Sequence, residues 1–152
     1  MTVRREKGPA SIDRIAAVLR GIEGVEGKVG WFESARYPDG TAVAYVATIH
    51  EFGTSRTPAR PFMRPAVAQY GQQWVELLGQ GAKAALNGEM GASAVLEMVT
   101  LRAAGDVAKS IQAVTSPPLH PATIARKGNS KPLVHTGQMI QSVTGKVEVS
   151  GG

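Results

Sequence analysis

The centre of the sequence contains two long segments whose apolar residues recur with helical spacing, and these segments constrain the fold more than any other feature. The first begins at Pro65, a residue that suits the first turn of a helix, and extends to about Leu86. Its large apolar side chains fall on one side: Val67, Tyr70, Trp74, Leu77 and Leu78. The second extends from Ala92 to Val114. The sequence therefore predicts two long helices as the largest elements of the fold.

Glycine and proline residues mark the ends of these helices. Asn87-Gly88 and Gly91 separate the two helices, and Ser116-Pro117-Pro118 ends the second one. The stretch from Ser116 to Pro132 contains four prolines, few large apolar residues and a basic centre. This composition is typical of a surface loop, so we expect a long loop there.

Shorter elements are predicted before the long helices. Ser11 can cap a helix that carries the apolar residues of the stretch 12–22, and residues 28–32 suit a strand. The apolar run over residues 41–52 suits either a buried helix or a buried strand. Its length, its alanines and a Gly53 placed at a helix C-terminus favour the helix.

The C-terminal part adds a short helix over residues 136–142 and a strand over residues 143–149. Together the elements predict an α+β fold. Its small mixed sheet packs against the two long helices, and a short N-terminal helix and a long proline-rich basic loop complete it.

Length and composition limit the organisation of the chain. With 152 residues, of which 43% are hydrophobic, it suits one domain. We expect this domain over residues 11–149, with flexible tails at 1–10 and 150–152. No apolar run reaches the roughly 18 residues of a membrane span, and the first residues lack a signal-peptide stretch. We therefore expect a protein that is made and used in the cytosol, with no membrane partner.

The composition also affects how a core can form. The chain has no cysteine, which excludes disulfides, thiolate metal sites and cysteine nucleophiles. Aromatic residues make up 5% of the chain, and 18 residues are glycine. A well-filled autonomous core is harder to build from this composition than from an average one, so partner surfaces are expected to complete it.

The motifs of catalytic and nucleotide sites are missing. The histidines His50, His120 and His135 match no metal-ligand spacing, and Thr54 stands where a zinc-protease helix that began at His50 would need its second histidine. A polar cap near a helix end is the simpler interpretation of His50. The sequence contains neither a nucleophile elbow nor a phosphate-binding glycine loop. We expect neither enzymatic activity nor a cofactor.

Basic residues gather in two segments that contain no acid, although the net charge is a modest +5. The two acid-free segments are residues 52–75 and 107–147, and their cations of most interest are Arg56, Arg60, Arg64, Arg126, Lys127 and Lys131. Such residues often form a solvated basic face, but arginines beside prolines can also hold carboxylates or phosphates in a fork geometry. Sequence-specific reading of DNA is not supported, because no recognised motif places basic and amide side chains together on one helix face.

Several stretches, in a fixed order, resemble a known family. They are Val29-Gly30-Trp31-Phe32, Tyr37-Pro38-Asp39-Gly40-Thr41, Val46-Ala47-Thr48-Ile49-His50-Glu51-Phe52-Gly53-Thr54, Pro58-Ala59-Arg60-Pro61-Phe62-Met63-Arg64-Pro65-Ala66 and Pro132-Leu133-Val134-His135-Thr136-Gly137. In this order they are similar to the signature of bacteriophage neck and tail completion proteins, the head-tail joining proteins of long-tailed phages. The similarity spans roughly residues 28–147.

The resemblance implies a structural virion protein, made in the host cytoplasm and located at the neck. It would form a ring, six-fold like a tail tube, between a head-closure or connector protein and a tail terminator or tail tube protein. The genome would pass through the ring without sequence-specific binding. The alternatives are the tail terminator itself, a small basic DNA-binding protein and, least supported by the motifs, a hydrolase.

The family motifs also carry expectations for single residues. Glu51, Phe52, Gly53 and Thr54 would form a helix stop, with Phe52 anchored in the core and Gly53 at positive φ. Pro61 lies in the second motif beside Phe62 and Met63, which are expected to fill the core, and Thr136 and Gly137 belong to the last motif. Arg60 and Arg64 are the best candidates for bonds across a subunit boundary. The wider set of candidate inter-subunit contacts is Arg56, Arg60, Arg64, Arg126, Lys127 and Lys131.

Overall fold

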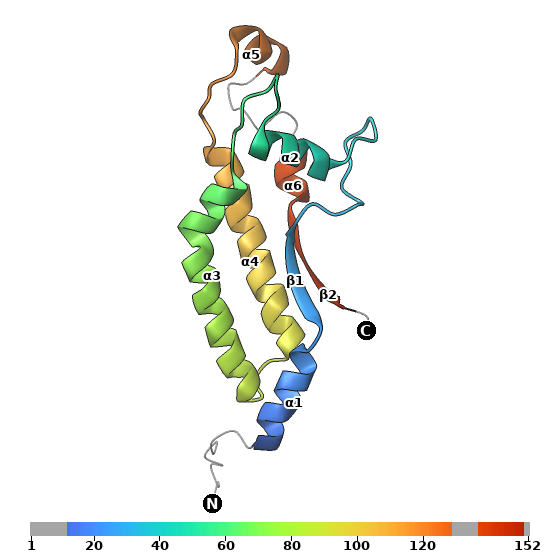
Figure 1. Ribbon diagram of the computed structural model, residues 1–152, viewed down its shortest axis with the longest axis vertical. Helices are drawn as coiled ribbons and strands as arrows, with labels where there is room; N and C mark the ends of the chain where they lie inside the picture. Colours follow the sequence, from blue (N-terminus) through green and yellow to red (C-terminus); the bar gives the residue numbers. More distant parts are fainter. Residues whose placement is uncertain (1–11, 129–136, 151–152) are drawn as a thin grey trace, which may run out of the picture.

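The computed structural model describes residues 12–128 and 137–150. Its elements, in chain order, are α1 (Ile12–Ile22), β1 (Val25–Gly30), α2 (Val43–Phe52), α3 (Met63–Leu86), α4 (Ala92–Ala113), α5 (Pro121–Lys127), α6 (Gln138–Ser142) and β2 (Thr144–Val149). The two long helices α3 and α4 form an antiparallel pair along the long axis, with α1 at one end of the molecule and α5 at the other (Figure 1). The α+β class predicted from the sequence is confirmed.

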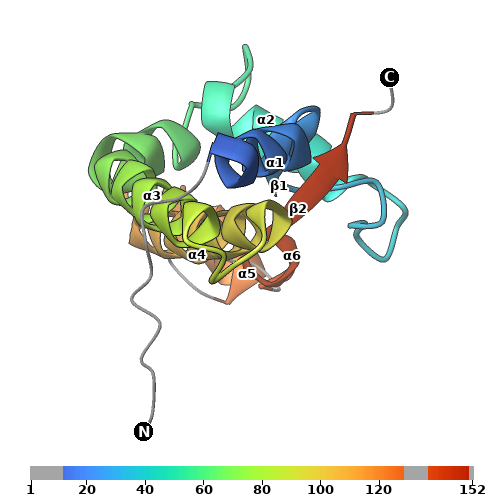
Figure 2. The same cartoon turned by 90° about the horizontal axis from the view of Figure 1, so that it is seen from below.

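Helix α4 is the central element. It packs against α3 on one side and against both strands on the other, and a view along the long axis shows it between them (Figure 2). The strands β1 and β2 come from opposite ends of the chain and pair antiparallel, with Val25 opposite Val149 and Gly30 opposite Thr144. Because the described sheet consists of this one antiparallel pair, it is not the mixed sheet that the sequence predicted.

Two glycines let the sheet approach α4 closely. A Cβ atom on Gly27 would lie 2.7 Å from the Thr100 methyl group, and one on Gly145 would lie 2.6 Å from the backbone carbonyl carbon of Thr100. Both glycines therefore have a packing role, which differs from the conformational role of glycines in turns.

We expect Gly145→Ala to reduce the free energy of unfolding by about 1–3 kcal/mol, because the new methyl group meets backbone atoms that cannot move aside. The control is Gly105→Ala on α4, where a Cβ meets nothing within 4 Å. Alanine is the better helix former, so this control is expected to gain up to about 1 kcal/mol. Urea unfolding of both variants measures the difference, and equal stability of the two would contradict the close approach.

The main core lies where the ends of α3 and α4 meet the two short helices α2 and α6. Its buried side chains are Val43, Ala47, Phe62, Ala66, Val107, Ile111 and Met139. Phe62 packs edge to face on Trp31 with ring centroids 5.6 Å apart, and the Trp31 indole N–H donates to the Met139 carbonyl at 2.8 Å. Segments from both halves of the chain therefore meet in this core. Phe62 is buried as predicted, and Met63 is half-buried against the same core.

The first strand differs from its prediction in position. Residues 28–32 were expected to form it, whereas β1 covers Val25–Gly30 and Trp31 and Phe32 follow it. The aromatic residues that suggested a strand instead serve packing: Trp31 contacts the core, and the Lys146 ammonium lies 5.4 Å from the centre of the Phe32 ring. Aromatic content alone does not separate a strand from the residues that follow it.

The stretch from Ser116 to Pro132 is not one continuous loop, because it contains helix α5. The helix begins with Pro121 in its first turn, and the imidazole Nδ1 of His120 accepts a hydrogen bond from the Ala122 N–H at 3.2 Å. It ends at Gly128, which adopts the left-handed conformation with φ 78°. These end signals were present in the sequence, but the few apolar residues between them gave little helical periodicity.

The ends of the chain are described in part. Of the expected tails, residues 1–10 and 151–152 lie outside the described residues, as does the expected cap Ser11. The Ser150 N–H donates to the Gly24 carbonyl, which continues the strand pairing by one bond. Among the helices that the structure describes, none combines the length and the apolar character that a membrane crossing requires.

Candidate functional site

A groove of about 830 Å³ opens between α2 and α5, at the end of the molecule away from α1. We call it the basic groove. Its basic side chains are Arg56, Arg60, Arg126 and Lys127, together with the imidazoles of His50 and His120. None of the described residues that line it is an aspartate or a glutamate. The groove therefore gathers cations from both acid-free segments of the sequence.

Arg60 holds two walls of the groove together. Its guanidinium donates from Nε to the Pro117 carbonyl at 2.8 Å and from Nη2 to the Pro118 carbonyl at 3.3 Å. Its backbone N–H donates to the His50 carbonyl at 2.7 Å. Arg60 is 7% exposed. The structure thus uses Arg60 inside the chain, which differs from the expected bond to an adjacent subunit.

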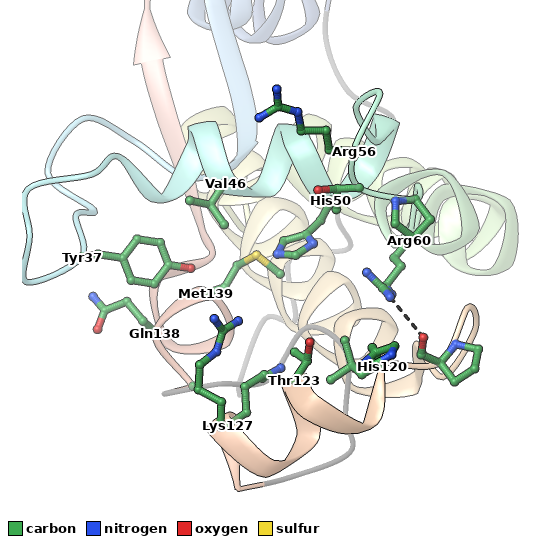
Figure 3. Close-up of a pocket in the computed structure, with 16 residues that line it drawn as sticks. Tyr37, Val46, His50, Arg56, Arg60, His120, Thr123, Lys127, Gln138 and Met139 are labelled. Carbon is green, nitrogen blue, oxygen red and sulfur yellow. Dashed lines mark hydrogen bonds between the residues drawn. The ribbon is translucent and has the colours of Figure 1, made fainter.

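Burial and the positive charges of the groove shift the pKa values of His50 and Lys127. Burial lowers the pKa of His50, and the nearby charges of Arg60 and Lys127 lower it further. Burial and the charge of Arg60 also lower the pKa of Lys127. The Nδ1 atom of His50 is buried and has no hydrogen-bond partner among the described residues. The His50 side chain points from α2 into the groove, beside Met139 (Figure 3).

Two further arginines line the groove without a salt bridge to the chain itself. Arg126 is exposed in the last turn of α5. Arg56 lies at the outer edge, on the other side of α2 from His50 and Met139, and its guanidinium is directed away from them (Figure 3). Neither guanidinium has an ion pair or hydrogen bond within the described part of the chain. Each is therefore available to an anion from outside.

Glu51 has a structural role that the sequence did not indicate. Its buried carboxylate accepts hydrogen bonds from the backbone N–H groups of Phe62 (2.8 Å), Met63 (2.9 Å) and Arg64 (3.2 Å), and from the Arg64 Nε at 2.9 Å. These backbone groups open α3, whose own N-cap residue Phe62 supplies no side-chain cap. A residue at the end of α2 thus caps the beginning of α3.

Phe52 is 67% exposed, so the expectation that it anchors in the core is wrong. The reason is helical phase: Glu51 occupies the inward-facing position at the end of α2, and the next residue points outward. The Arg64 guanidinium lies 5.4 Å from the centre of the Phe52 ring, in a cation–π contact. The side chain of Arg64 is 64% exposed and lies on Glu51 and Phe52, outside the basic groove.

The turn after α2 agrees with the prediction for Gly53. Its φ is 72°, and a Cβ atom there would lie 2.7 Å from the Ala59 nitrogen, so both conformation and space require glycine. The Thr54 hydroxyl accepts hydrogen bonds from the backbone N–H groups of Arg56 at 3.2 Å and Thr57 at 3.0 Å. This compact turn places Arg56 and Arg60 beside the groove.

The remaining motif residues lie partly within and partly outside the described residues. Pro61 is half-buried next to Phe62, and Gly137 adopts the left-handed conformation with φ 75° immediately before α6. Gly137 also lines the groove. Thr136 and Lys131 lie outside the described residues, as does His135.

Sequence reasoning missed two parts of the site region. It did not place His50 and His120 beside the arginines, because the two histidines lie on segments that meet only in the folded chain. It also missed the fully buried Asp106 on α4, although an acid among the apolar positions of a predicted helix is a usable signal. Within residues 12–128 and 137–150 no group of three or more histidines and carboxylates is placed to hold a metal ion.

Comparisons with known proteins find no matching family, no matching curated protein and no matching solved structure.

Proposed function

We propose that the protein is a structural virion protein of a tailed bacteriophage, a tail completion or head-tail joining protein that forms a ring between the head-closure protein and the tail. The resemblance of its motifs supplies the identity of the assembly. The structural observation that carries the proposal is the apolar surface that the chain leaves uncovered, because an assembly subunit needs such a surface and a self-sufficient monomer does not.

The uncovered surface is most regular on α1. Ile12, Ile15, Leu19 and Ile22 recur at helical spacing on one face and are 84%, 37%, 56% and 42% exposed. No residue of α1 is buried. An amphipathic helix normally covers its apolar face, so a neighbouring chain is the natural cover in an assembly.

The sheet offers a second surface for assembly. It consists of β1 and β2, so each strand has one edge with no partner strand within the described residues. Such edges pair readily with a strand of another chain. Val149 on β2 is 73% exposed at the same sheet. Sheet edges and the α1 face together supply the two unlike surfaces that a head-to-tail ring contact requires.

In this proposal the protein has no catalytic role. It belongs to the virion neck, contacts a head-closure or connector protein on one side and a tail terminator or tail tube protein on the other, and lets the genome pass through its channel. A ring with six-fold symmetry matches a tail tube.

The test is assembly of the purified protein. We expect a closed ring at high protein concentration, seen by native mass spectrometry and by electron microscopy of particles with a central opening. The double variant Ile12→Glu/Leu19→Glu is expected to remain monomeric, because it places charges on an apolar contact surface. Its helical circular dichroism and thermal unfolding are expected to match the wild type, since both side chains are exposed in the single chain.

The matched control is Arg20→Glu, which places the same charge at an exposed polar position of α1. It is expected to assemble like the wild type. Rings formed equally well by the double variant would contradict a role of the α1 face, and a strictly monomeric wild type at all concentrations, in the presence of tail tubes as well, would contradict the neck proposal.

A further inference from the structure

The basic groove combines two kinds of surface. Besides its cations, it is lined by the apolar side chains of Val46, Leu119 and Met139. Its volume of about 830 Å³ is enough for several side chains of a ligand. A ligand that fits both surfaces must carry negative charge and apolar groups close together.

We propose that the basic groove binds an acidic segment of a partner polypeptide. Carboxylates of the segment pair with Arg126 and, at the outer edge, with Arg56, while an apolar side chain of the segment packs against Leu119 and Met139. The inference rests on the proposed function in one respect, because a neck protein must bind other proteins. It adds the location and the chemistry of one such contact.

Guanidinium groups suit this ligand. A guanidinium donates two parallel hydrogen bonds to a carboxylate, and such bonds between charged groups are stronger than neutral ones. Arg56 and Arg126 are not engaged by acids of their own chain within the described residues. Arg60 adds its positive charge from the wall of the groove.

The distribution of the other cations argues for a peptide and against nucleic acid. Outside the groove, Arg64, Arg102 and Lys109 each form a salt bridge with a buried carboxylate of the chain. Lys28 and Lys146 both pair with Glu148. Duplex DNA binds along a path of cations that neutralise successive phosphates. Here Arg56, Arg60, Arg126 and Lys127 line one concave site between two helices, a shape that suits a peptide segment better than the extended backbone of a duplex.

His50 supplies an internal reporter of binding. Its imidazole faces the groove, where Arg60 and Lys127 act on it from the other elements and His120 lines the opposite wall. Burial and these two cations lower its pKa. A carboxylate bound nearby opposes the field of the cations, so the pKa of His50 is expected to rise on binding.

The experiment uses the full chain and a blocked synthetic peptide of alternating Glu and Leu residues, with the same peptide carrying Gln in place of Glu as its uncharged counterpart. Binding is measured by calorimetry, and the His50 pKa is followed by NMR titration. We expect the acidic peptide to bind and to raise the His50 pKa. Arg56→Glu/Arg126→Glu is expected to weaken binding at least about 10-fold, which is the loss of a favourable charge contact.

The matched control is Arg20→Glu/Lys83→Glu, which changes the net charge equally at exposed positions that do not line the groove. It is expected to keep the wild-type affinity within about twofold, because long-range charge is screened. If Arg56→Glu/Arg126→Glu does not fold, the single variant Arg126→Gln tests the contact of Arg126 with the peptide by a smaller change.

Four results would overturn the proposal: equal binding of the Gln peptide, an equal loss in the control variant, an unchanged His50 pKa, or tighter binding of a short duplex DNA that displaces the peptide. None of these readouts depends on ring formation. If the protein binds the peptide but forms no rings, the neck proposal is refuted and peptide binding by the basic groove stands. If it forms rings but does not bind the peptide, the neck proposal stands and peptide binding by the groove is refuted.

Discussion

Replacing Glu51 with alanine is expected to lower the free energy of unfolding by about 3 kcal/mol, because it leaves backbone N–H groups at the start of α3 without an acceptor. The carboxylate is almost fully buried and accepts four hydrogen bonds from three consecutive residues at the start of α3. Without it, the buried Phe62 N–H has no acceptor, and α3 loses the negative charge that offsets its dipole at the N-terminus.

The measurement is urea unfolding of Glu51→Ala beside Glu33→Ala, an exposed loop position. The control is expected to stay within about 0.5 kcal/mol of the wild type, as surface substitutions usually do. Glu51→Gln is expected to fall between the wild type and Glu51→Ala, because its amide oxygen still accepts hydrogen bonds while its charge is gone. A loss in Glu51→Ala no larger than in the control would refute the capping role.

Asp106 carries the second large expected effect. It is fully buried on α4, and its carboxylate accepts hydrogen bonds from the Trp74 indole at 3.0 Å, the Arg102 Nε at 3.0 Å and the Lys109 ammonium at 2.9 Å. Trp74 lies on α3, so the carboxylate joins the two long helices. Asp106→Ala is expected to lose about 2–3 kcal/mol, because the indole N–H of Trp74 loses its acceptor while Arg102 and Lys109, which are half exposed, can turn to solvent.

The loss of stability in Asp106→Ala can be followed by tryptophan fluorescence and compared with a control variant on α4. The emission of Trp74 is expected to change in Asp106→Ala, since the hydrogen bond of its indole is removed. Glu97→Ala changes an exposed carboxylate of α4 and is expected to leave both the emission and the stability near the wild type. Wild-type stability in Asp106→Ala would mean that the helix pair does not depend on this carboxylate.

Both carboxyl groups link stability to pH in the same direction. Burial by itself raises the pKa of Glu51 and of Asp106, but their hydrogen bonds outweigh burial and hold the two pKa values below their usual 4.5 and 3.8. Their stabilisation is therefore complete above the unfolded-state pKa values and is lost as pH falls through the folded-state values. The wild type is expected to lose stability below about pH 4, and each variant is expected to show a flatter profile there.

The sequence by itself determined all the longer helices, but not the short helix α5. Four predicted helices, 12–22, 41–52, 65–86 and 92–114, lie within two residues of α1, α2, α3 and α4 at each end. Helical hydrogen bonds join residues four apart, so apolar spacing and the breakers beside it contain nearly all the information that sets a helix. The positive φ of Gly53 was predictable for the same reason, because it depends on the local turn.

The charge pattern also gave part of the candidate site. The two acid-free segments contain all four of the arginines and lysines that line the basic groove. The sequence did not predict which of these cations can bind a ligand. The Arg60 guanidinium donates its hydrogen bonds to backbone carbonyl groups 57 and 58 residues away along the chain.

Only the tertiary structure decided the roles of the motif residues. Glu51 and Phe52 are neighbours in sequence, yet their roles differ. Glu51 is buried and caps α3, whereas Phe52 is exposed and its ring contacts the Arg64 guanidinium. Trp31 was predicted to lie within a strand but lies just after β1, and its indole N–H donates to the carbonyl of Met139, 108 residues further along the chain. Contacts of this kind form between segments that folding brings together, and the free energy of burial that selects them depends on the whole packed core, which no local pattern of residues contains.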